Sequence, residues 1–225
     1  MNGDWLTTAR QTLPRLYRLL DQLEPTYRIR DARDVSPEFV AREGIEAVVW
    51  DVDGTLMAYH ASAIEPLFVP GLEALRAVGV RQAILSNCGE ARFVELGQMF
   101  PDFPIVRAYS MGEERVYRVL HQGEDSLGSD QAKDLLARGA RQVRKPDGPL
   151  LLATLDAVGT SDPSAALMVG DQFLTDVASG NLAGTRSAKL PAWAKQTFPV
   201  TLRVSQGLER FLYRISRLRG PKRSS

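Results

Sequence analysis

Short apolar runs alternate along the chain with longer segments whose apolar residues recur every three or four positions. The runs are bounded by polar or glycine-containing turns and predict buried strands, whereas the longer segments predict helices. The predicted strands are residues 47–50, 80–85, 104–106, 165–169 and 186–190. The predicted helices between them are residues 70–77, 90–99, 148–158 and 175–182.

This alternation is typical of a parallel sheet whose strands are joined by crossover helices. We therefore predict an α/β fold with a Rossmann-like open parallel sheet and helices on both faces. Crossover connections place the functional loops of such a fold at the carboxyl ends of its strands. Candidate chemistry is accordingly sought in the residues that directly follow each predicted strand.

Two amphipathic segments flank the predicted sheet. Residues 5–23 predict an N-terminal helix, and Ser36 followed by Pro37 predicts a short helix that ends at Gly44. Residues 205–219 predict a C-terminal helix that leads into a basic end. The apolar positions of the two long helices are Leu13, Leu16, Tyr17, Leu20 and Leu23, and Leu208, Phe211, Leu212 and Ile215.

Residues 108–143 interrupt the alternation and predict an insertion made of two short, charged, helix-like pieces. Ser129 is expected to cap the second piece. The insertion is interpreted either as a partial lid or as a surface elaboration, because it is short for an independent core. The expected organisation is a helical lead-in (1–44), a core (45–107 and 144–204), this insertion, and a C-terminal amphipathic basic helix and tail (205–225).

Charge and cysteine content narrow the classes of function. The chain has 225 residues, with 28 Lys and Arg against 27 Asp and Glu, so no global positive field points to nucleic acid. The single cysteine, Cys88, excludes an intramolecular disulfide. No apolar run approaches the roughly 20 residues that span a bilayer. We therefore expect a cytoplasmic protein.

Two carboxylates follow the first strand one residue apart, in the stretch EAVVWDVDGTL. A two-residue period aims Asp51 and Asp53 the same way, and Gly54 permits a turn whose N–H groups face an anion. A simple hairpin turn at Asp53-Gly54 is the alternative without function. A calcium loop is excluded because Thr55 and Leu56 stand where it requires Asp or Asn and then Gly.

Other polar residues follow the later strands. Ser86 follows the second strand, Lys145 precedes a proline after the insertion, and Asp171 follows the fourth strand with Asp176 five residues further on. Taken singly, Lys145 is typical of a surface lysine and Asp176 of a helix N-cap. The order of carboxylate pair, hydroxyl, lysine and carboxylate is far more specific than any one member.

This ordered set resembles the four motifs of the haloacid dehalogenase (HAD) superfamily, with DVDGT, Ser86, Lys145 and GDQFLTD in turn. The stretches SNCGEAR, GDQFLTDVASGNLAG and LERFLYRI are similar to its subfamily IIIA, the YqeG-like group related to phosphatidylglycerophosphate phosphatases. Cys88 stands where that group usually has a second asparagine. The resemblance implies an HAD-like core that is capless or carries only a small insertion.

The motif set and the resemblance together imply a Mg²⁺-dependent phosphatase that forms an aspartyl phosphate. Asp51 is expected to be the nucleophile, Asp53 the general acid and base, and Lys145 a catalytic neutralising charge. Mg²⁺ is expected to bind Asp51, the main-chain carbonyl of Asp53, and Asp171. The expected phosphate-binding residues are Gly54, Thr55, Ser86, Asn87 and Lys145, with Asp176 orienting Lys145 or a water on the metal.

The substrate is less constrained than the chemistry. One hypothesis is a lipid phosphate such as phosphatidylglycerophosphate, reached by peripheral contact with the inner membrane surface through the terminal helices. The alternative for these helices is packing on the core, which apolar stripes more often indicate. The alternatives for function are a phosphatase for a soluble sugar or nucleotide phosphate, and a non-catalytic module that retains the metal site.

Overall fold

The computed structural model describes residues 19–218 of the chain. Its strands are β1 (Tyr27–Arg28), β2 (Ala47–Trp50), β3 (Arg81–Ile84), β4 (Ile105–Met111), β5 (Glu114–His121), β6 (Glu124–Asp125), β7 (Arg141–Val143), β8 (Ala166–Gly170) and β9 (Arg186–Lys189). Its α-helices are α3 (Pro37–Glu43), α4 (Val69–Ala77), α5 (Glu90–Met99), α6 (Ser129–Ala137), α7 (Gly148–Asp156), α8 (Ala178–Ala183) and α9 (Val200–Leu218). Short helical turns include η2 (Leu20–Gln22), η3 (Ala32–Asp34), η4 (Pro163–Ala165), η5 (Phe173–Val177, a π-helical turn) and η6 (Lys195–Thr197).

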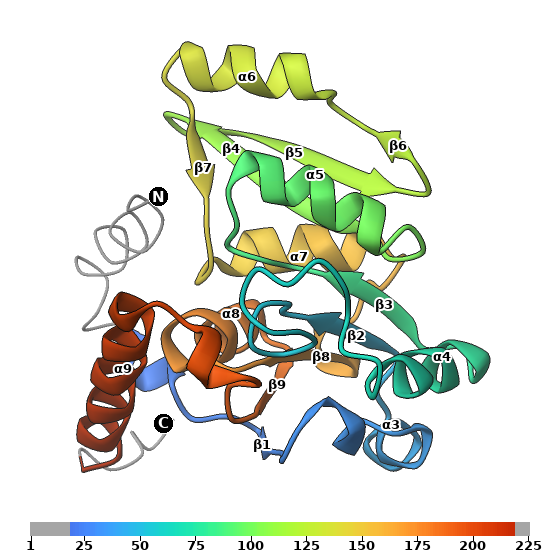
Figure 1. Cartoon of the computed structure of the whole chain (residues 1–225), viewed down its shortest axis with the longest axis vertical. Helices are drawn as coiled ribbons and strands as arrows, with labels where there is room; N and C mark the ends of the chain where they lie inside the picture. The colour runs from blue at the N-terminus through green and yellow to red at the C-terminus, as the bar shows by residue number, and fades with distance from the viewer. Residues whose placement is uncertain (1–18, 219–225) are drawn as a thin grey trace.

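One mixed sheet runs through the described part of the chain (Figure 1). Parallel pairing joins β1, β9, β8, β2, β3 and β4 in that order. Antiparallel pairing adds β5 and β7 to β4, and β6 to β5. The predicted α/β fold, with a predominantly parallel sheet between helices, is confirmed, and all five predicted core strands are present with ends shifted by a few residues at most, apart from the longer β4.

The two faces of the sheet follow from the alternation of side chains along each strand. In β2, Val48 and Trp50 join the core cluster that holds the apolar residues of α3, α4 and α5. Ala47 and Val49 point to the opposite face and join the cluster formed with α7 and α8. All four residues of β2 are buried, which explains why this strand reads as a continuous apolar run.

The short helix α3 matches its sequence signals. The hydroxyl of Ser36 accepts a hydrogen bond from the N–H of Phe39 at 3.2 Å, and Pro37 occupies the first turn. Gly44 ends the helix with φ of 63°, a conformation that costs glycine little.

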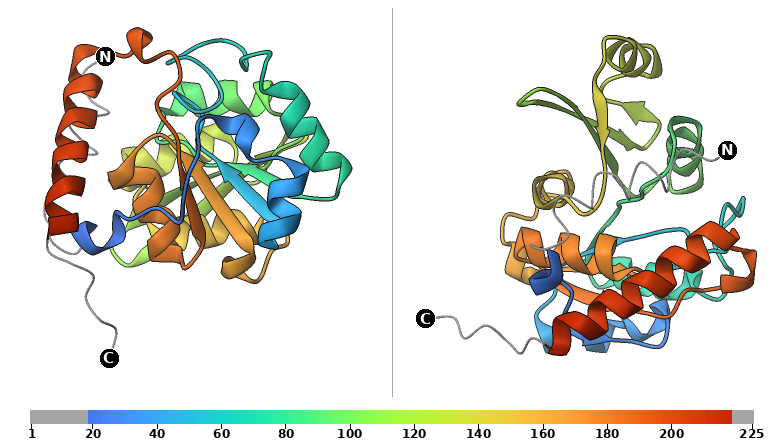
Figure 2. Two further views of the ribbon diagram at one scale, coloured as in Figure 1. Left: turned by 90° about the horizontal axis from the view of Figure 1, so that it is seen from below. Right: turned by 90° about the vertical axis from the view of Figure 1, so that its left-hand side faces the viewer.

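The insertion differs from the prediction. The first of the two expected helical pieces is a strand pair, because β4 continues across the expected boundary to Met111 and β5 returns beside it. The charges of β5 resembled a helix surface, yet Arg118 and Leu120 both point inward from alternate positions. The second piece is helix α6, which projects from the core with β4 and β5 (Figure 2).

The predicted cap of α6 is wrong. Ser129 is the first residue of this helix, and its N-cap position is occupied by Gly128. The Ser129 hydroxyl instead accepts a hydrogen bond from Arg118 at 2.9 Å. The hydroxyl oxygen of Ser129, which was predicted to cap the helix backbone, therefore accepts from the buried guanidinium of Arg118 instead.

The terminal segments are described only in part. Most of the predicted N-terminal helix, with Leu13, Leu16 and Tyr17, lies outside the described residues, while Leu20 and Leu23 are buried against α9 and η5. The C-terminal helix α9 begins at Val200, earlier than predicted, and lies along one side of the core (Figure 2). Among residues 19–218, no helix has both the length and the apolar character needed to cross a bilayer.

Candidate active site

The site lies at the carboxyl ends of the adjacent parallel strands β2 and β8. From β2 the chain continues to the neighbouring strand on one side, β3, and from β8 to the neighbouring strand on the other side, β9. Trp50 and Val169 are paired neighbours near the ends of these strands, so Asp51 and Asp171 emerge side by side. The N–H of Asp51 extends the pairing by donating to the carbonyl of Val169 at 2.9 Å. A crevice at such a topological switch point is the usual ligand site of an open α/β sheet.

Lys145 joins two of the carboxylates at this crevice. Its ammonium lies 2.6 Å from Oδ1 of Asp51 and 2.7 Å from Oδ1 of Asp176. The lysine is only 2% exposed, so the surface-lysine alternative is wrong. Asp176 lies within the π-helical turn η5, and its second oxygen accepts a hydrogen bond from the N–H of Gln172 at 3.0 Å.

The cluster carries more negative than positive charge. Oxygen atoms of Asp51, Asp171 and Asp176 lie within 4.8 Å of one another, and the ammonium of Lys145 bridges Asp51 and Asp176. Burial raises the pKa of Asp51 to about 7, although Lys145 opposes the shift. Burial, followed by repulsion from Asp51 and Asp176, raises the pKa of Asp171 well above its ordinary value. Burial alone would lower the pKa of Lys145, but the charges of Asp176 and Asp51 outweigh it and raise that pKa.

The carboxylate oxygens of this cluster fit a divalent cation. Oδ1 of Asp171 is buried and has no hydrogen-bond partner among residues 19–218, whereas its Oδ2 accepts a hydrogen bond from Gln206 at 2.7 Å. Both oxygens of Asp176 are already occupied by Lys145 and Gln172. Asp171, with its unpartnered Oδ1, and Asp51, whose Oδ2 receives only a long hydrogen bond of 3.3 Å from Thr55, are therefore the side chains that could hold a hard cation such as Mg²⁺, which prefers oxygen ligands.

Two glycines let the chain approach these carboxylates closely. Gly54 has φ of +89°, and a Cβ added there would lie 2.4 Å from the ring of Phe198 and 3.1 Å from Oδ2 of Asp171. A Cβ at Gly170 would lie 2.2 Å from Oδ2 of Asp176. Larger residues at either position would displace the groups that form the site.

The carboxylate of Asp53 lies apart from the cluster. Its Oδ1 accepts a hydrogen bond from the N–H of His60 at 2.8 Å and lies 3.4 Å from Nη2 of Arg92. The strand period does not extend to Asp53, because β2 ends at Trp50 and the chain then turns. Asp51 and Asp53 thus have different partners, contrary to the expectation that they point the same way. Arg92, 5% exposed, was missed because nothing in its sequence context marks a buried arginine.

Asn87 holds the main chain of Lys145 in place. Its side-chain Nδ2 donates to the carbonyl of Lys145 at 2.9 Å, and its Oδ1 accepts from the N–H of Lys145 at 2.7 Å. The second and third motifs are therefore joined by a two-bond clamp. Ser86 is half-buried just before Asn87, and Thr55 donates to Oδ2 of Asp51 at 3.3 Å. Phosphate binding by Ser86, Asn87, Gly54 and Thr55 stays a prediction.

Arginine side chains fix the carbonyl groups of the loop that carries Asn87. Arg107 donates to the carbonyls of Cys88 and Gly89 at 2.7 and 3.2 Å. Arg144 donates to the carbonyl of Asn87 at 3.0 Å. Cys88 is buried among these groups.

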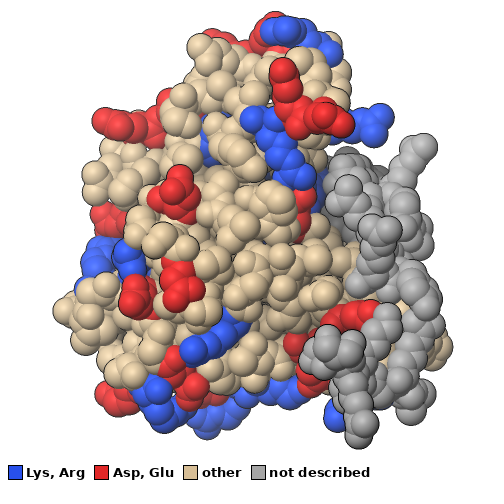
Figure 3. All heavy atoms as spheres, turned by 180° about the vertical axis from the view of Figure 1, so that it is seen from behind, with Lys and Arg blue, Asp and Glu red and all other residues tan. Residues whose placement is uncertain are grey.

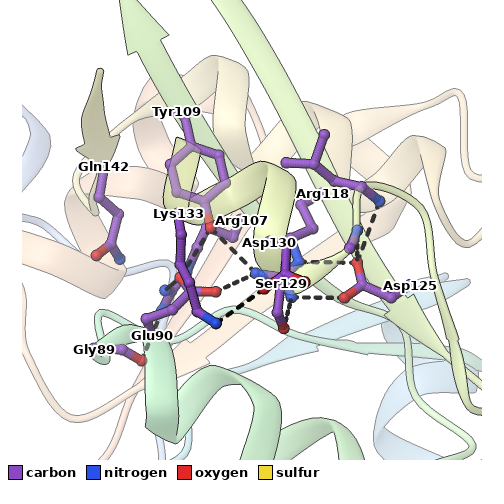
Figure 4. A network of polar contacts seen from close by, with 12 residues as sticks. Gly89, Glu90, Arg107, Tyr109, Arg118, Asp125, Ser129, Asp130, Lys133 and Gln142 are labelled. Atoms are coloured by element: carbon purple, nitrogen blue, oxygen red, sulfur yellow. Dashed lines mark hydrogen bonds and ion pairs between the residues drawn. The ribbon is translucent and has the colours of Figure 1, made fainter. Parts of the chain in front are cut away.

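Glu90, at the start of α5, connects this loop to the insertion (Figure 4). It accepts hydrogen bonds from Arg107 at 2.7 Å and Tyr109 at 2.9 Å, and it also pairs with Arg118. The fully buried Arg118 continues the network to Asp125 at 2.6 Å. The insertion is thus linked by ion pairs to the segment that bears the second motif.

The C-terminal helix α9 faces the site with polar residues. Besides the bond from Gln206 to Asp171, Oε2 of Glu209 accepts from the N–H of Phe173 at 3.1 Å. Tyr213 stacks on the ring of Phe173 with centroids 4.4 Å apart. Burial, with repulsion from Asp176, raises the pKa of Glu209 to about 8.

The predicted apolar stripe of α9 is divided, because Leu212 is half-buried and packs against the core cluster that includes Phe173 and Tyr213, whereas two other members are exposed. Leu208 and Phe211, which were expected on one apolar stripe, are 54% and 58% exposed. The inward face instead carries Gln206, Glu209 and Tyr213, all of which are buried. Their spacing of three and four residues is the spacing of one helix face and could have indicated that this face is buried. Polar side chains at this spacing, however, are more often interpreted as an exposed face.

Comparisons with known proteins agree with the motif assignment. A family model described as HAD-hydrolase-like matches residues 142–190, which include Lys145, Asp171 and Asp176. Phosphatidylglycerophosphate phosphatase 1, chloroplastic/mitochondrial, from Arabidopsis thaliana is 27% identical over 186 residues, which cover 82% of this chain and 45% of that protein. The chain thus spans less than half the length of this curated relative. The resemblance to the HAD superfamily inferred from the motifs is confirmed.

Solved structures similar to the chain include two hydrolases. One is a haloacid dehalogenase-like family hydrolase from Brucella suis 1330, with 15% identity, a TM-score of 0.39, and coverage of 68% of this chain and 88% of that chain. The other is the p-nitrophenyl phosphatase from Archaeoglobus fulgidus, with 18% identity, a TM-score of 0.22, and coverage of 78% of this chain and 67% of that chain.

Gly170→Ala is expected to destabilise the protein by about 2 kcal/mol, because the added Cβ forces Asp176 away from Lys145. Urea denaturation of the two proteins measures the difference. Gly71→Ala is the matched control, since a Cβ there meets nothing within 4 Å and α4 tolerates alanine. Equal loss of stability in both variants would contradict the steric role of Gly170.

Mg²⁺ is expected to raise the melting temperature more at about pH 8 than at about pH 5. The folded-state pKa values of Asp51 and Asp171 lie above their ordinary value of 3.8, so their contribution to stability is present at low pH. In metal-free protein this contribution is lost as the pH rises through about 7, where Asp51 ionises. A bound cation offsets the loss. Thermal unfolding with MgCl₂ or EDTA measures the effect, and Asp171→Asn should reduce it.

Proposed function

We propose that this HAD-like chain is a Mg²⁺-dependent phosphatase that hydrolyses a phosphate monoester through an aspartyl phosphate on Asp51. The observation that carries the proposal is the ammonium of Lys145, held 2.6 Å from the Asp51 carboxylate inside a buried acidic cluster. An ammonium in this position neutralises charge on the nucleophile and on an incoming phosphoryl group. The relative from Arabidopsis thaliana, named as a phosphatase, supports the same reaction class.

The residues of the chain supply both half-reactions. An oxygen of Asp51 attacks phosphorus, the bond from phosphorus to the alcohol oxygen breaks, and Asp53 donates a proton to that oxygen. Asp53 then accepts a proton from water, whose oxygen attacks phosphorus and breaks the bond to Asp51. Phosphate leaves, and both aspartates return to their starting states. The carboxylate of Asp53 is half-buried and is not paired with Lys145, since its partners are the N–H of His60 and the guanidinium of Arg92.

The supporting residues hold these groups in position. Asp176 fixes the ammonium of Lys145 through a second ion pair, and Asn87 fixes the lysine main chain. Gly54, Thr55 and Ser86 are the proposed contacts for phosphate oxygens, together with main-chain N–H groups near Asn87. When bound by Asp51, Asp171 and the carbonyl of Asp53, Mg²⁺ supplies positive charge that reduces repulsion between the nucleophile and the substrate.

The proposed substrate is a lipid phosphate such as phosphatidylglycerophosphate. The name of the Arabidopsis relative supports this choice. A second support is an apolar stripe on the outer face of α9, formed by Val200, Val204, Leu208 and Phe211, each more than half exposed. Arg210 and Arg214 lie on the same helix and are exposed. Apolar and cationic residues side by side on one helix are typical of contact with an anionic lipid surface.

Asp51→Asn is expected to lower phosphate release more than about a thousandfold, because the amide is a poor nucleophile. Purified protein is assayed with phosphatidylglycerophosphate in mixed micelles and with soluble sugar and nucleotide phosphates, with Mg²⁺ or with EDTA. The matched control is Asp102→Asn, a surface aspartate paired with Arg76, which should retain activity. Retained activity in Asp51→Asn would exclude this mechanism. Preference for a soluble ester would exclude the lipid substrate, and no release from any ester by the unaltered protein would favour a binding module.

The double substitution Leu208→Ser with Phe211→Ser is expected to weaken binding to vesicles containing phosphatidylglycerol by at least about tenfold, because two exposed apolar side chains are lost. Co-sedimentation at low salt measures the partition. Val78→Ser is the control, since Val78 is also 58% exposed but follows α4. An unchanged partition in the double variant would show that α9 is not the lipid contact.

A further inference from the structure

A second space adjoins the proposed metal site. A cavity of about 1030 Å³ lies between the segment that follows β9 and the inner side of α9, and Asp171 contributes to its wall. This space, called the basic cavity below, therefore opens next to a residue of the acidic cluster. Its cationic lining residues are Arg28, Lys189, Lys195, Arg210, Arg214 and Arg217.

Acidic residues do not balance these cations. The described lining includes two carboxylates, Asp171 and Glu209. Asp171 accepts from Gln206 and belongs to the acidic cluster, while Glu209 accepts the N–H of Phe173. Both acidic and basic side chains are spread over the face shown in Figure 3, whereas the lining of the basic cavity contains six cations.

Several of the cations have no ion-pair partner among residues 19–218. This holds for Lys195, Arg210, Arg214 and Arg217, although Nε of Arg210 donates to the main-chain carbonyl of Gln206 at 3.1 Å. Their charges are thus available to a ligand. Burying an unpaired charge costs free energy, but Arg210, Arg214 and Arg217 are exposed to solvent and do not incur this cost.

The other two cations are held against aromatic rings. The guanidinium of Arg28 lies 4.9 Å from the ring centroid of Tyr213, and Nζ of Lys189 lies 5.0 Å from that of Phe173. Because Phe173 and Tyr213 stack on each other, they form a rigid floor that positions both charges. The cavity is therefore preorganised on this side.

The arginines of α9 that line the cavity lie at increasing distances along the helix from the residue that contacts the proposed metal site. Gln206 contacts Asp171, and Arg210, Arg214 and Arg217 follow at four, eight and eleven residues along the same stripe of the helix. At 1.5 Å per residue, Arg210 begins about 6 Å along the helix axis from the residue that touches Asp171. A ligand anchored at the acidic cluster would meet the first of these cations after a linker of only a few atoms.

We propose that the basic cavity binds a second anionic group of the substrate, so that the enzyme selects phosphate monoesters that carry another phosphate group a few bonds away. The inference rests on the proposed phosphatase function, since it assigns substrate selection at the same site. A phosphodiester of a lipid headgroup and a second phosphate of a soluble ester share this chemistry. Arg210 is the proposed specificity-determining residue because, of the α9 arginines that line the cavity, it is the nearest to Gln206, which contacts Asp171, and Arg214 continues the cationic wall.

Soluble substrates test the inference without interference from a membrane. We compare glycerol 3-phosphate, propane-1,3-diyl bisphosphate, and glycerophosphoglycerol phosphate, in which the second group is a phosphodiester. The protein is expected to prefer the two substrates with a second anion by at least about tenfold in kcat/KM, mainly through a lower KM. Preference for the diester over the bisphosphate would identify a lipid-type headgroup, and the reverse preference a free phosphate ester.

Arg210→Gln and Arg214→Gln are expected to reduce this preference severalfold to tenfold. Arg203→Gln is the matched control, because Arg203 is an exposed arginine on the same helix that does not line the cavity. Equal values of kcat/KM for all three substrates in the unaltered protein would overturn the inference while leaving phosphatase activity in place. So would an equal loss of preference in Arg203→Gln.

A binding measurement separates failure of the inference from failure of the proposed function. Titration calorimetry with Asp51→Asn protein measures the affinity for the same three compounds without turnover. Tighter binding of the two doubly anionic compounds, lost when Arg210→Gln is added, supports the basic cavity even if no phosphate is released. Equal affinity for all three compounds would overturn the inference whether or not the unaltered protein is active.

Discussion

The contact on which the site depends is the ammonium of Lys145 between the carboxylates of Asp51 and Asp176. Lys145, just before α7, and Asp176, in the π-helical turn η5, are 31 residues apart in sequence, and both are buried where an unpaired charge would be costly. The contact requires Gly170, which leaves room for Asp176, and Asn87, which fixes the main chain of the lysine. Packing around the charges therefore determines where they meet.

A second ionic network supports the first from the opposite side. The insertion pairs Arg118 with Glu90, and Arg107 binds the carbonyls of the loop before α5. Removing one partner of such a buried pair leaves the other charge uncompensated, so the network constrains the loop strongly. The insertion, expected as a partial lid or a surface elaboration, thus also contributes to the position of Asn87 and so of Lys145. Its strands continue the main sheet, which explains how so short a segment is held without a core of its own.

The fold was predictable because buried parallel strands leave a continuous apolar signal and polar residues at their carboxyl ends. The same logic placed Asp51, Lys145, Asp171 and Asp176 in one crevice. It failed at β5, because the charge of the buried Arg118 was interpreted as part of the polar surface of a helix. It also failed at Asp53, because the chain turns after β2 and the alternation of side chains along the strand ends there. Buried polar groups such as Gln206 and Glu209 depend on partners more than 30 residues away, so local spacing could not identify them.

Helix α9 carries two groups of residues that the proposed reaction requires. One group contacts the buried site, and the other faces the rest of the substrate. Its inner face orients Asp171 through Gln206 and supports the π-helical turn through Glu209 and Tyr213. Its outer face exposes apolar side chains, and arginines lie between the two. Groups on one helix move together, so contact of the outer face with a substrate surface would leave the spacing between the arginines and Gln206, which holds Asp171, unchanged. A long substrate could then be held by several weak contacts, while its reacting phosphate is positioned by the buried cluster and by the contacts proposed for Gly54, Thr55 and Ser86.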